Sequence, residues 1–290
     1  MSAYNRLKTK SATFRQLTGL SLAEFDKLLA ELEVAYQARR AQQQRRRPRR
    51  RRPGGGRHPK LALADQLLVV LIYYRTYITQ DFLGFLFGID KGTACRIIQA
   101  IGLLLVGLFR IPETKVQIHA DEIAEAFVDA TEQPTYRPTK QQRRSYSGKK
   151  KRHTVKHQVV VVRKKKRRGR KRQARKVRIA AVSEGAQGKV HDKKLYDRSR
   201  LQIPPGVKKI GDSGYQGTDL KVPRKKPRGG RLSRRARRGN RRLAKKRIVV
   251  EHGIGKMKIW RIAADRYRNP LRRHTRMMKN VAGLHNRMFG

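Results

Sequence analysis

The hydrophobic positions in the first part of the chain recur at helical spacing. Ser21 and Glu24 fit a capping box, in which two side chains three residues apart satisfy the first free amide groups of a helix. The apolar side chains that follow share one face of that helix: Leu22, Phe25, Leu28, Leu29 and Leu32. We predict a helical segment over residues 1–44 that serves packing or dimerisation.

The next apolar runs predict a compact helical domain over residues 61–118. One helix is expected from Asp65 to Tyr77, and Thr79 is a suitable N-cap for a second helix. A glycine-containing turn at 88–90 then leads into a third helix.

This order of helices and turn is typical of a helix-turn-helix DNA-binding domain. In that interpretation Lys91, Thr93 and Arg96 lie in or beside a DNA groove. An ordinary three-helix packing module has the same pattern, so the periodicity alone does not decide between the two.

Residues 45–60 separate these two helical parts. They are almost entirely arginine, proline and glycine, a composition that excludes regular structure. Two readings stay open: a solvated linker, and a basic arm that lies along phosphates or in a minor groove.

From residue 119 the pattern changes to short apolar runs that predict strands. Four strands are expected, over 124–130, 155–162, 177–182 and 207–210. The basic stretch 163–176 between the second and third predicts a hairpin whose tip contacts DNA. Helices are expected over 191–200, 243–260 and 271–288, with an irregular basic stretch over 221–242. The pattern predicts an α/β domain over 119–290, a mixed sheet flanked by helices.

Charge points to the partner of the chain. The 74 Lys and Arg residues against 20 Asp and Glu give a formal net charge of +54. Such a chain repels itself unless a polyanion is present, so we expect nucleic acid, bound in a salt-sensitive manner.

The single cysteine, Cys95, excludes a disulfide framework and a Cys-rich zinc site, and it favours a reducing compartment. The first residues are polar, so no signal peptide is expected. The apolar runs 67–74 and 97–109 are too short for a membrane span, so a soluble protein is expected.

Three acidic residues stand out in this basic chain. Asp129 is expected at the end of the first strand, Asp212 at the end of the fourth, and Glu251 on a helix among cations. Strand ends and a crossing helix can bring three carboxylates together, where hard divalent cations would neutralise them. Two such ions would support phosphoryl transfer. Turns at Asp129 and Asp212 and an ion pair of Glu251 with Arg247 are the alternative.

Seven short motifs, in order along residues 60–290, together resemble a DDE transposase. They are Val128–Glu132, Tyr146–Thr154, Gly188–Lys194, Gly211–Gly217, Lys226–Gly230, Arg247–His252 and Arg266–Asn269. The chain is similar to the bacterial insertion-sequence transposases conventionally numbered five, which are akin to the Harbinger-type nucleases.

The resemblance implies an RNase H-like catalytic domain preceded by an all-α helix-turn-helix domain. It implies that Asp129, Asp212 and Glu251 bind two Mg²⁺ ions, with Mn²⁺ as an alternative. His191 and Asp192 fall on a supporting His-Asp pair, although Asp192 is equally suited to cap a helix.

The remaining implications concern the partners. The basic motif residues Lys149, Lys150, Lys151 and Arg152, together with Arg247, are expected to contact DNA. The expected partners are double-stranded DNA, as transposon ends and target, and further copies of the chain in a dimer or larger multimer; no membrane and no small-molecule substrate is expected. The expected location is the cytoplasm, at the nucleoid. The alternative is a catalytically inactive, domesticated DNA-binding protein of transposase origin.

Overall fold

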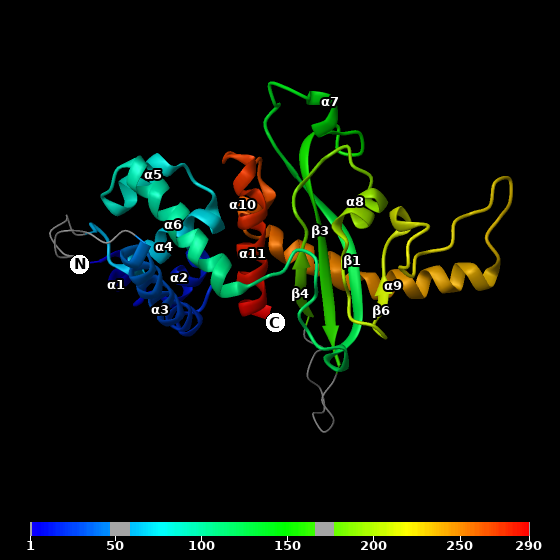
Figure 1. Cartoon of the computed structure of the whole chain (residues 1–290), viewed down its shortest axis with the longest axis horizontal. Helices are drawn as coiled ribbons and strands as arrows, with labels where there is room; N and C mark the ends of the chain where they lie inside the picture. Colours follow the sequence, from blue (N-terminus) through cyan, green and yellow to red (C-terminus); the bar gives the residue numbers. More distant parts are fainter. Residues whose placement is uncertain (1, 47–58, 166–176, 290) are drawn as a thin grey trace. The chain divides into compact units, whose positions relative to one another are not determined.

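The computed structural model describes residues 2–46, 59–165 and 177–289 (Figure 1). The chain divides into two compact units. The first comprises Met1–Arg110 and Trp260–Ile262, and the second comprises Ile111–Ile259 and Ala263–Gly290. The four-part division expected from the sequence stays a prediction.

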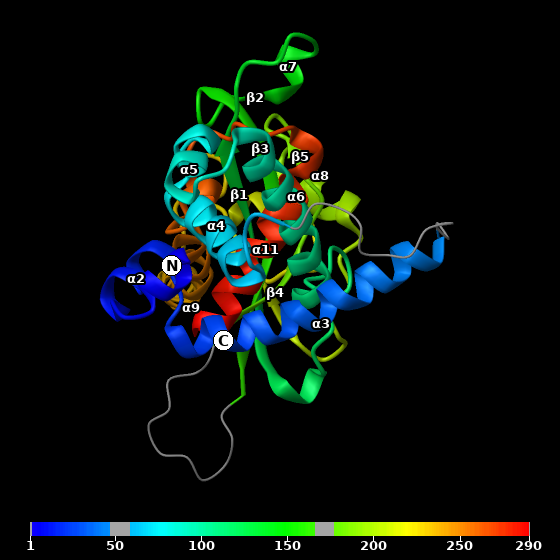
Figure 2. The same cartoon turned by 90° about the vertical axis from the view of Figure 1, so that its left-hand side faces the viewer.

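The described part of the first unit is helical. Its helices are α1 (Ala3–Leu7), α2 (Ser11–Thr18), α3 (Leu22–Arg46), α4 (Leu63–Thr76), α5 (Gln80–Phe87) and α6 (Lys91–Phe109). The helix α3 extends beyond the other helices of this unit (Figure 2). It continues through Arg46, so the first residues of the predicted linker are helical. Glutamine and arginine are good helix formers, and the helix contains no glycine or proline. Most of the linker, 47–58, lies outside the described residues.

The predicted helix caps of the first unit are present. The backbone amide of Ser21 donates to Glu24 Oε2 at 3.0 Å, and the amide of Glu24 donates back to Ser21 Oγ at 3.3 Å. The amide of Phe82 donates to Thr79 Oγ1 at 3.2 Å. Both caps satisfy amide groups that a helix leaves without intrahelical partners, and they fix where α3 and α5 begin.

The core of the first unit lies around α4. Every side chain of this helix from Leu67 to Tyr74 is buried, and α2, α3, α5 and α6 contact it or one another.

In the described part of the chain one helix, α6, is long and apolar enough to span a membrane by length and composition. It packs on α3, α4 and α5, and core helices of globular domains pass the same test.

The second unit is built on a mixed sheet with helices on both faces. Its strands are β1 (Ile123–Pro134), β2 (Tyr146–Ser147), β3 (Arg152–Lys164), β4 (Val177–Val182), β5 (Ala186–Gln187) and β6 (Lys208–Ile210). Its helices are α7 (Gln142–Ser145), α8 (Asp192–Ser199), α9 (Arg234–Lys258) and α11 (His274–Phe289); the residues of α10 (Arg261–Ala264) are divided between the two units.

The strands β1 and β3 form the centre of the sheet. They are antiparallel, β6 lies parallel to the other edge of β1, and β2, β4 and β5 pair with β3. The antiparallel pairing of β3 with β4 confirms the predicted hairpin. Its tip, 166–176, lies outside the described residues.

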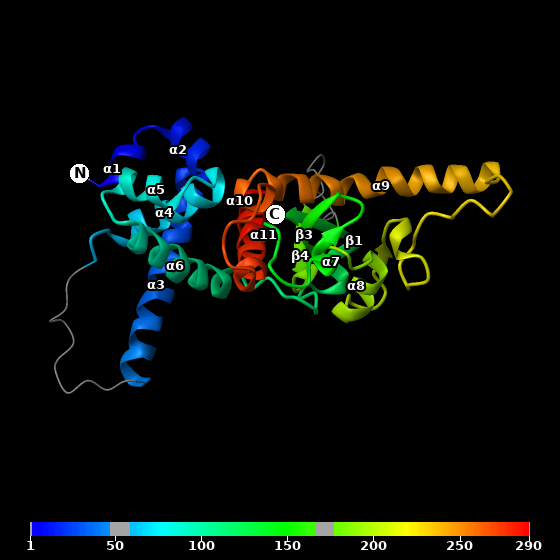
Figure 3. The same cartoon turned by 90° about the horizontal axis from the view of Figure 1, so that it is seen from above.

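The alternation of side chains along β1 and β3 divides the unit into two layers (Figure 3). Even-numbered residues such as Val128 and Val160 belong to an apolar cluster on the side of α8, together with Tyr215. Odd-numbered Val161 faces α9, where Gly253 lets the helix approach: a Cβ on that glycine would lie 3.2 Å from a Val161 methyl group. The period of two along a strand thus assigns one face of the sheet to each helix.

Two predicted boundaries are wrong. β1 continues to Pro134, so Asp129 lies within the strand and not at its end, because Thr131 and Gln133 are buried and pair with β3. The helix α9 begins at Arg234, within the stretch 221–242 that was expected to be irregular. Arginine and lysine are good helix formers, and Ser233 caps the helix by accepting the amide hydrogen of Ala236.

Candidate active site

Asp129 on β1 lies near Asp212, which follows the end of the neighbouring parallel strand β6. Phe127 on β1 is in register with Ile210 on β6, and each aspartate follows two residues later. Asp212 Oδ1 accepts the amide hydrogen of Gly214 at 2.8 Å and caps a short 3-10 helix, Ser213–Tyr215. The turn that the sequence suggested at Asp212 is therefore present, and the same turn sets this carboxylate beside Asp129.

Asp129 is largely buried beside a cation. Burial raises the pKa of this carboxyl to about 6, and the charges of Asp212 and Asp192 act in the same direction. The amide of Ala130 donates to Asp129 Oδ1 at 2.8 Å, and Arg247 Nη2 lies 3.5 Å from Oδ2; both contacts oppose the rise. The arginine on α9 thus pairs with Asp129, not with Glu251 as the alternative interpretation expected.

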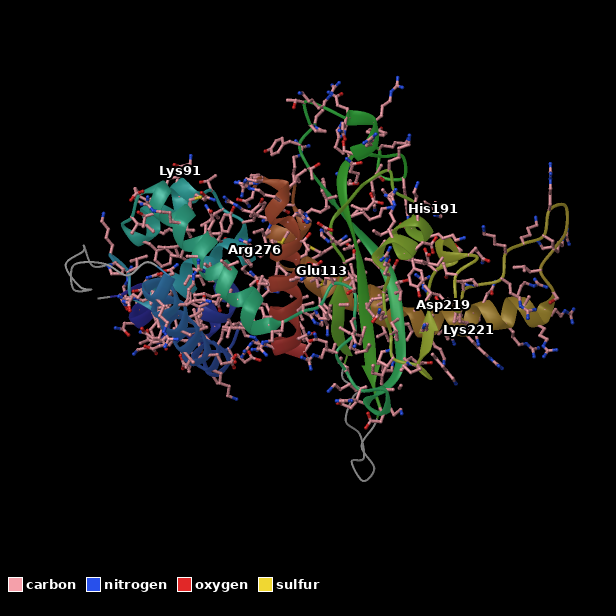
Figure 4. The ribbon with its side chains drawn as sticks, in the orientation of Figure 1. Lys91, Glu113, His191, Asp219, Lys221 and Arg276 are labelled. Atoms are coloured by element: carbon pink, nitrogen blue, oxygen red, sulfur yellow. The ribbon has the colours of Figure 1, made fainter. Side chains whose placement is uncertain are left out.

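A third carboxylate, Asp192, is brought to the same place from the start of α8. His191 caps that helix by accepting the amide hydrogen of Lys193 at 3.3 Å, so the cap expected for Asp192 is wrong. Figure 4 shows His191 at this helix. Asp192 Oδ1 instead accepts from Lys156 Nζ at 2.9 Å.

Lys156 on β3 joins two acidic residues in the interior. Its ammonium group lies 3.2 Å from Glu132 on β1 and also donates to the carbonyl oxygen of Val190 at 2.8 Å. The side chains of Lys156 and Glu132 are each 8% exposed. Sequence reasoning assigned a role to neither residue; the one available signal was a lysine within a predicted strand, three residues before four consecutive valines.

Two polar atoms at this site have no hydrogen-bond partner among the described residues. They are the hydroxyl of Tyr215, a fully buried side chain, and Nε of Arg247. Burial raises the pKa of Tyr215, and the charges of Asp192, Asp129 and Asp212 raise it further. A buried polar atom without a hydrogen-bond partner lowers the stability of the folded state. These two groups therefore indicate that the site accommodates a ligand.

Glu251 lies on α9 with its side chain exposed. It shares a helical stripe with Arg247, four residues before it, and Lys258, seven residues after it. Arg247 contacts Asp129, and the charge of Asp129 also acts on Lys258. Within the described residues, no three His, Cys, Asp or Glu side chains are grouped closely enough to hold a metal ion. The structure therefore brings Asp129 and Asp212 together and leaves Glu251 on the adjoining stripe.

The residues expected in a DNA groove surround the start of α6 in the first unit. Figure 4 shows Lys91 there, paired with Asp81 at 3.0 Å and 65% exposed. Thr93 Oγ1 donates to Asp90 Oδ2 at 2.6 Å and accepts from Arg96 Nη2 at 2.8 Å. Exposed pairs of this kind contribute little stability, so a phosphate could replace them at small cost.

The basic motif before β3 lies at an exposed turn. Lys149, Lys150, Lys151 and Arg152 are all exposed, and the amide of Lys150 donates to Ser147 Oγ at 3.3 Å. Burial and the neighbouring charge of Lys150 lower the pKa of Lys258, while Glu132 and Asp129 raise it. The charge of Lys150 therefore acts on Lys258, on which the charges of Glu132 and Asp129 also act.

A basic groove of about 870 Å³ lies between the first half of α9 and the β6 edge of the sheet. Its cationic lining residues are Lys208, Lys221, Arg224, Arg234, Arg235, Arg238, Arg242 and Lys246. Figure 4 shows Lys221 beside α9. The one acidic lining residue, Glu125, pairs with both Arg163 and Lys246. Asn240 holds the groove together through two hydrogen bonds with the backbone of Arg224, of 2.9 and 3.0 Å.

Comparisons with known proteins agree with this arrangement. Residues 128–286 match the family model of DDE superfamily endonucleases, and residues 59–110 match the model of the helix-turn-helix of DDE superfamily endonucleases. The helix-turn-helix part thus precedes an α/β endonuclease part.

Two curated relatives cover most of the chain. The "Probable transposase for insertion sequence element IS702" of Microchaete diplosiphon is 32% identical over 79% of this chain and 82% of its own length. The "Putative transposase for insertion sequence element IS112" of Streptomyces albus G is 29% identical over 71% of this chain and 72% of its own length. No solved structure matches the chain significantly. By the extent of these matches, the chain belongs to the DDE superfamily of endonucleases.

Proposed function

We propose that the chain is an insertion-sequence transposase that binds the terminal inverted repeats of its element and catalyses metal-dependent cleavage and strand transfer of DNA. The observation that carries the proposal is the placement of Asp129 near Asp212, which follows the neighbouring parallel strand β6. Family membership supports it, as do two relatives named as transposases. A closer kinship with the insertion-sequence group numbered five and with Harbinger-type nucleases, and an RNase H-like domain, are parts of the same proposal.

The donor set fits hard divalent cations. Carboxylate oxygens are the ligands that Mg²⁺ prefers, and the unpartnered Tyr215 hydroxyl shows that the site is polar where it is buried. Asp129, Asp212 and Glu251 would hold two Mg²⁺ ions, with Mn²⁺ as an alternative. Ions bound there supply the charge stabilisation that phosphoryl transfer requires.

The protein's own residues would position the DNA. Arg247 already neutralises part of the charge on Asp129, and Lys150 and Lys258 add positive charge where a phosphate would approach. The basic groove along α9 would bind the phosphate backbone beyond the cleavage point. In the first unit, Lys91, Thr93 and Arg96 would contact the element's ends.

Substitution of the carboxylates tests the proposal. Asp129→Asn and Glu251→Gln should abolish Mg²⁺-dependent cleavage of DNA that carries the element's ends, while binding of that DNA is retained. Glu184→Gln, a substitution at an exposed position, is the matched control and should cleave normally.

Two outcomes would count against this assignment. Undiminished cleavage by either carboxylate variant would remove that residue from the site. DNA binding without metal-dependent cleavage by the unaltered chain would instead support the alternative, an inactive DNA-binding protein of transposase origin. Two ends must be held together for strand transfer, so a dimer or larger multimer on DNA is expected.

A further inference from the structure

Asp192 is held in one orientation by a buried lysine. Its Oδ1 atom accepts from Lys156 Nζ at 2.9 Å, and the same ammonium group binds Glu132 and the carbonyl oxygen of Val190. These contacts leave Oδ2 on the side of Gly214. The lysine therefore fixes one oxygen of Asp192 and presents the other to the loop that follows β6.

Gly214 is closely approached by two carboxylates. A Cβ at this position would lie 3.0 Å from Asp212 Oδ1 and 3.3 Å from Asp192 Oδ2. The φ angle of Gly214 lies outside the left-handed region, so the backbone does not require glycine here. The absence of a side chain is explained by the close approach of the two carboxylates, one of which a side chain would displace.

The hydroxyl of Tyr215 lies close enough to the same carboxylates for their charges to act on it. The side chain is fully buried, and its oxygen has no partner among the described residues. Asp192, Asp129 and Asp212 all act on it electrostatically, Asp192 most strongly. An unpartnered buried hydroxyl among three acidic side chains indicates a ligand that the carboxylates and the hydroxyl surround together.

We propose that Asp192 is a third carboxylate ligand of the divalent-cation site formed by Asp129 and Asp212, and that Lys156 is the positioning residue that aims it. The inference rests on the proposed function, because it deepens the same metal site. Among the described residues, no three His, Cys, Asp or Glu side chains are grouped closely enough to hold an ion, so binding requires the carboxylates to move closer together. Asp192 would then contribute Oδ2 to the ion while Oδ1 keeps its bond to Lys156.

Direct Mn²⁺ binding to the full-length chain, measured by electron paramagnetic resonance of the free ion, tests the proposal. Asp192→Asn should raise the dissociation constant for Mn²⁺ by about tenfold or more, a range typical of disturbed metal ligand shells. Asp197→Asn, at an exposed position on the same helix, should bind Mn²⁺ as the unaltered chain does. Thermal melting in EDTA shows whether each variant is folded.

A change of metal preference separates ligation from a purely structural pairing with Lys156. Asp192→Cys should weaken Mn²⁺ binding and create Zn²⁺ binding, because thiolates prefer softer ions, while Asp197→Cys should do neither. Lys156→Arg should retain most Mn²⁺ affinity, since it preserves the cation that orients Asp192.

Asp129→Asn distinguishes failure of this inference from failure of the proposed function. Loss of Mn²⁺ binding in Asp129→Asn with unchanged binding in Asp192→Asn would overturn the role of Asp192 and leave the proposed site intact. Unchanged Mn²⁺ binding in both variants would overturn both. Loss in Asp192→Asn, with Zn²⁺ binding gained in Asp192→Cys, is the result expected.

Discussion

The two units of the molecule differ in what they bury. Of the fourteen buried polar or charged residues among the described residues, Thr18 and Asp65 belong to the first unit and the other twelve to the second. The two in the first unit serve local structure: Thr18 donates to the carbonyl oxygen of Phe14 at 2.7 Å, and Asp65 accepts the amide hydrogen of Tyr4 at 2.8 Å.

The difference shows which unit depends on buried polar pairs for its stability. An apolar core is stabilised roughly in proportion to the area it removes from water, and it tolerates changes that conserve volume. A buried polar group stabilises only while its partner is present, and its loss leaves an uncompensated group. The second unit carries this risk because it buries most of these groups, Glu125 and Lys156 among them.

The largest expected effect therefore comes from the second unit. Lys156→Met should lower its free energy of unfolding by about 4 kcal/mol, because Glu132 and Asp192 would lose their shared cation in a buried place. Hydrogen exchange, followed separately for the two units, measures this, because a chain of two units need not unfold in one step.

Lys164→Met is the matched control for that variant. Lys164 lies on the same strand and pairs with Glu122 at 3.0 Å, but its side chain is 31% exposed and that of its partner 46%. Its loss should change the stability by less than about 1 kcal/mol. Equal effects of the two substitutions would show that burial does not determine how much the ion pairs of Lys156 contribute to the free energy of unfolding.

A cavity in the first unit should have the next largest effect. Leu28 on α3 is fully buried, and Leu28→Ala should lower the stability of this unit by roughly 3 kcal/mol through lost contacts and incomplete collapse. Val34→Ala on the same helix, where the side chain is 72% exposed, should have little effect. Urea unfolding of both variants measures the difference. A Leu28→Ala variant as stable as Val34→Ala would contradict the conclusion that apolar packing stabilises this unit.

The contrast also explains which features the sequence predicts. The helices around Ser21 and Thr79 follow from caps and spacing, because both are properties of residues close together in the chain. The same holds for Asp212, since a strand, a carboxylate and two glycines in succession already specify the turn. Local patterns thus predict most of the first unit and part of the site.

What the sequence does not predict depends on pairing between distant segments. Glu132 and Lys156 form an ion pair through the register of β1 with β3, which no local pattern reveals. The end of β1 beyond Asp129 depends on the same partner strand. No local pattern reveals a role for the Tyr215 hydroxyl either, because the three carboxylates whose charges act on it come from three separate elements.

A pair of buried histidines should make the second unit sensitive to acid. His157 Nδ1 donates to the carbonyl oxygen of Ser183 at 2.8 Å, and His157 Nε2 accepts from His274 Nδ1 at 2.7 Å. Burial lowers the pKa of His157 to about 4 and lowers that of His274 as well. The unfolded chain then binds more protons than the folded one between about pH 4 and 6.5, so stability is lost as the pH falls through this window.

Both histidines contribute to that loss. Because burial lowers the pKa of each, the folded pair binds neither proton in this window, whereas the unfolded chain binds both below about pH 6.5. We therefore expect stability to fall by up to about 2.7 kcal/mol per pH unit. Unfolding at a series of pH values measures the slope. His119→Gln, at an exposed position, should leave the slope unchanged, whereas a slope unaffected by His274→Asn would contradict the assignment.

The smallest expected effect comes from the capping box of the first unit. Ser21→Ala should cost about 1 kcal/mol, because the amide of Glu24 loses its acceptor while solvent remains available to it. Glu24→Ala should cost a similar amount by freeing the amide of Ser21. The double variant should be more stable than the sum of the two single effects implies, because each side chain supports the placement of the other. Strict additivity of the two effects in urea unfolding would mean that the two contacts act independently. The control Glu33→Gln, farther along the exposed face of α3, should show no measurable change in stability.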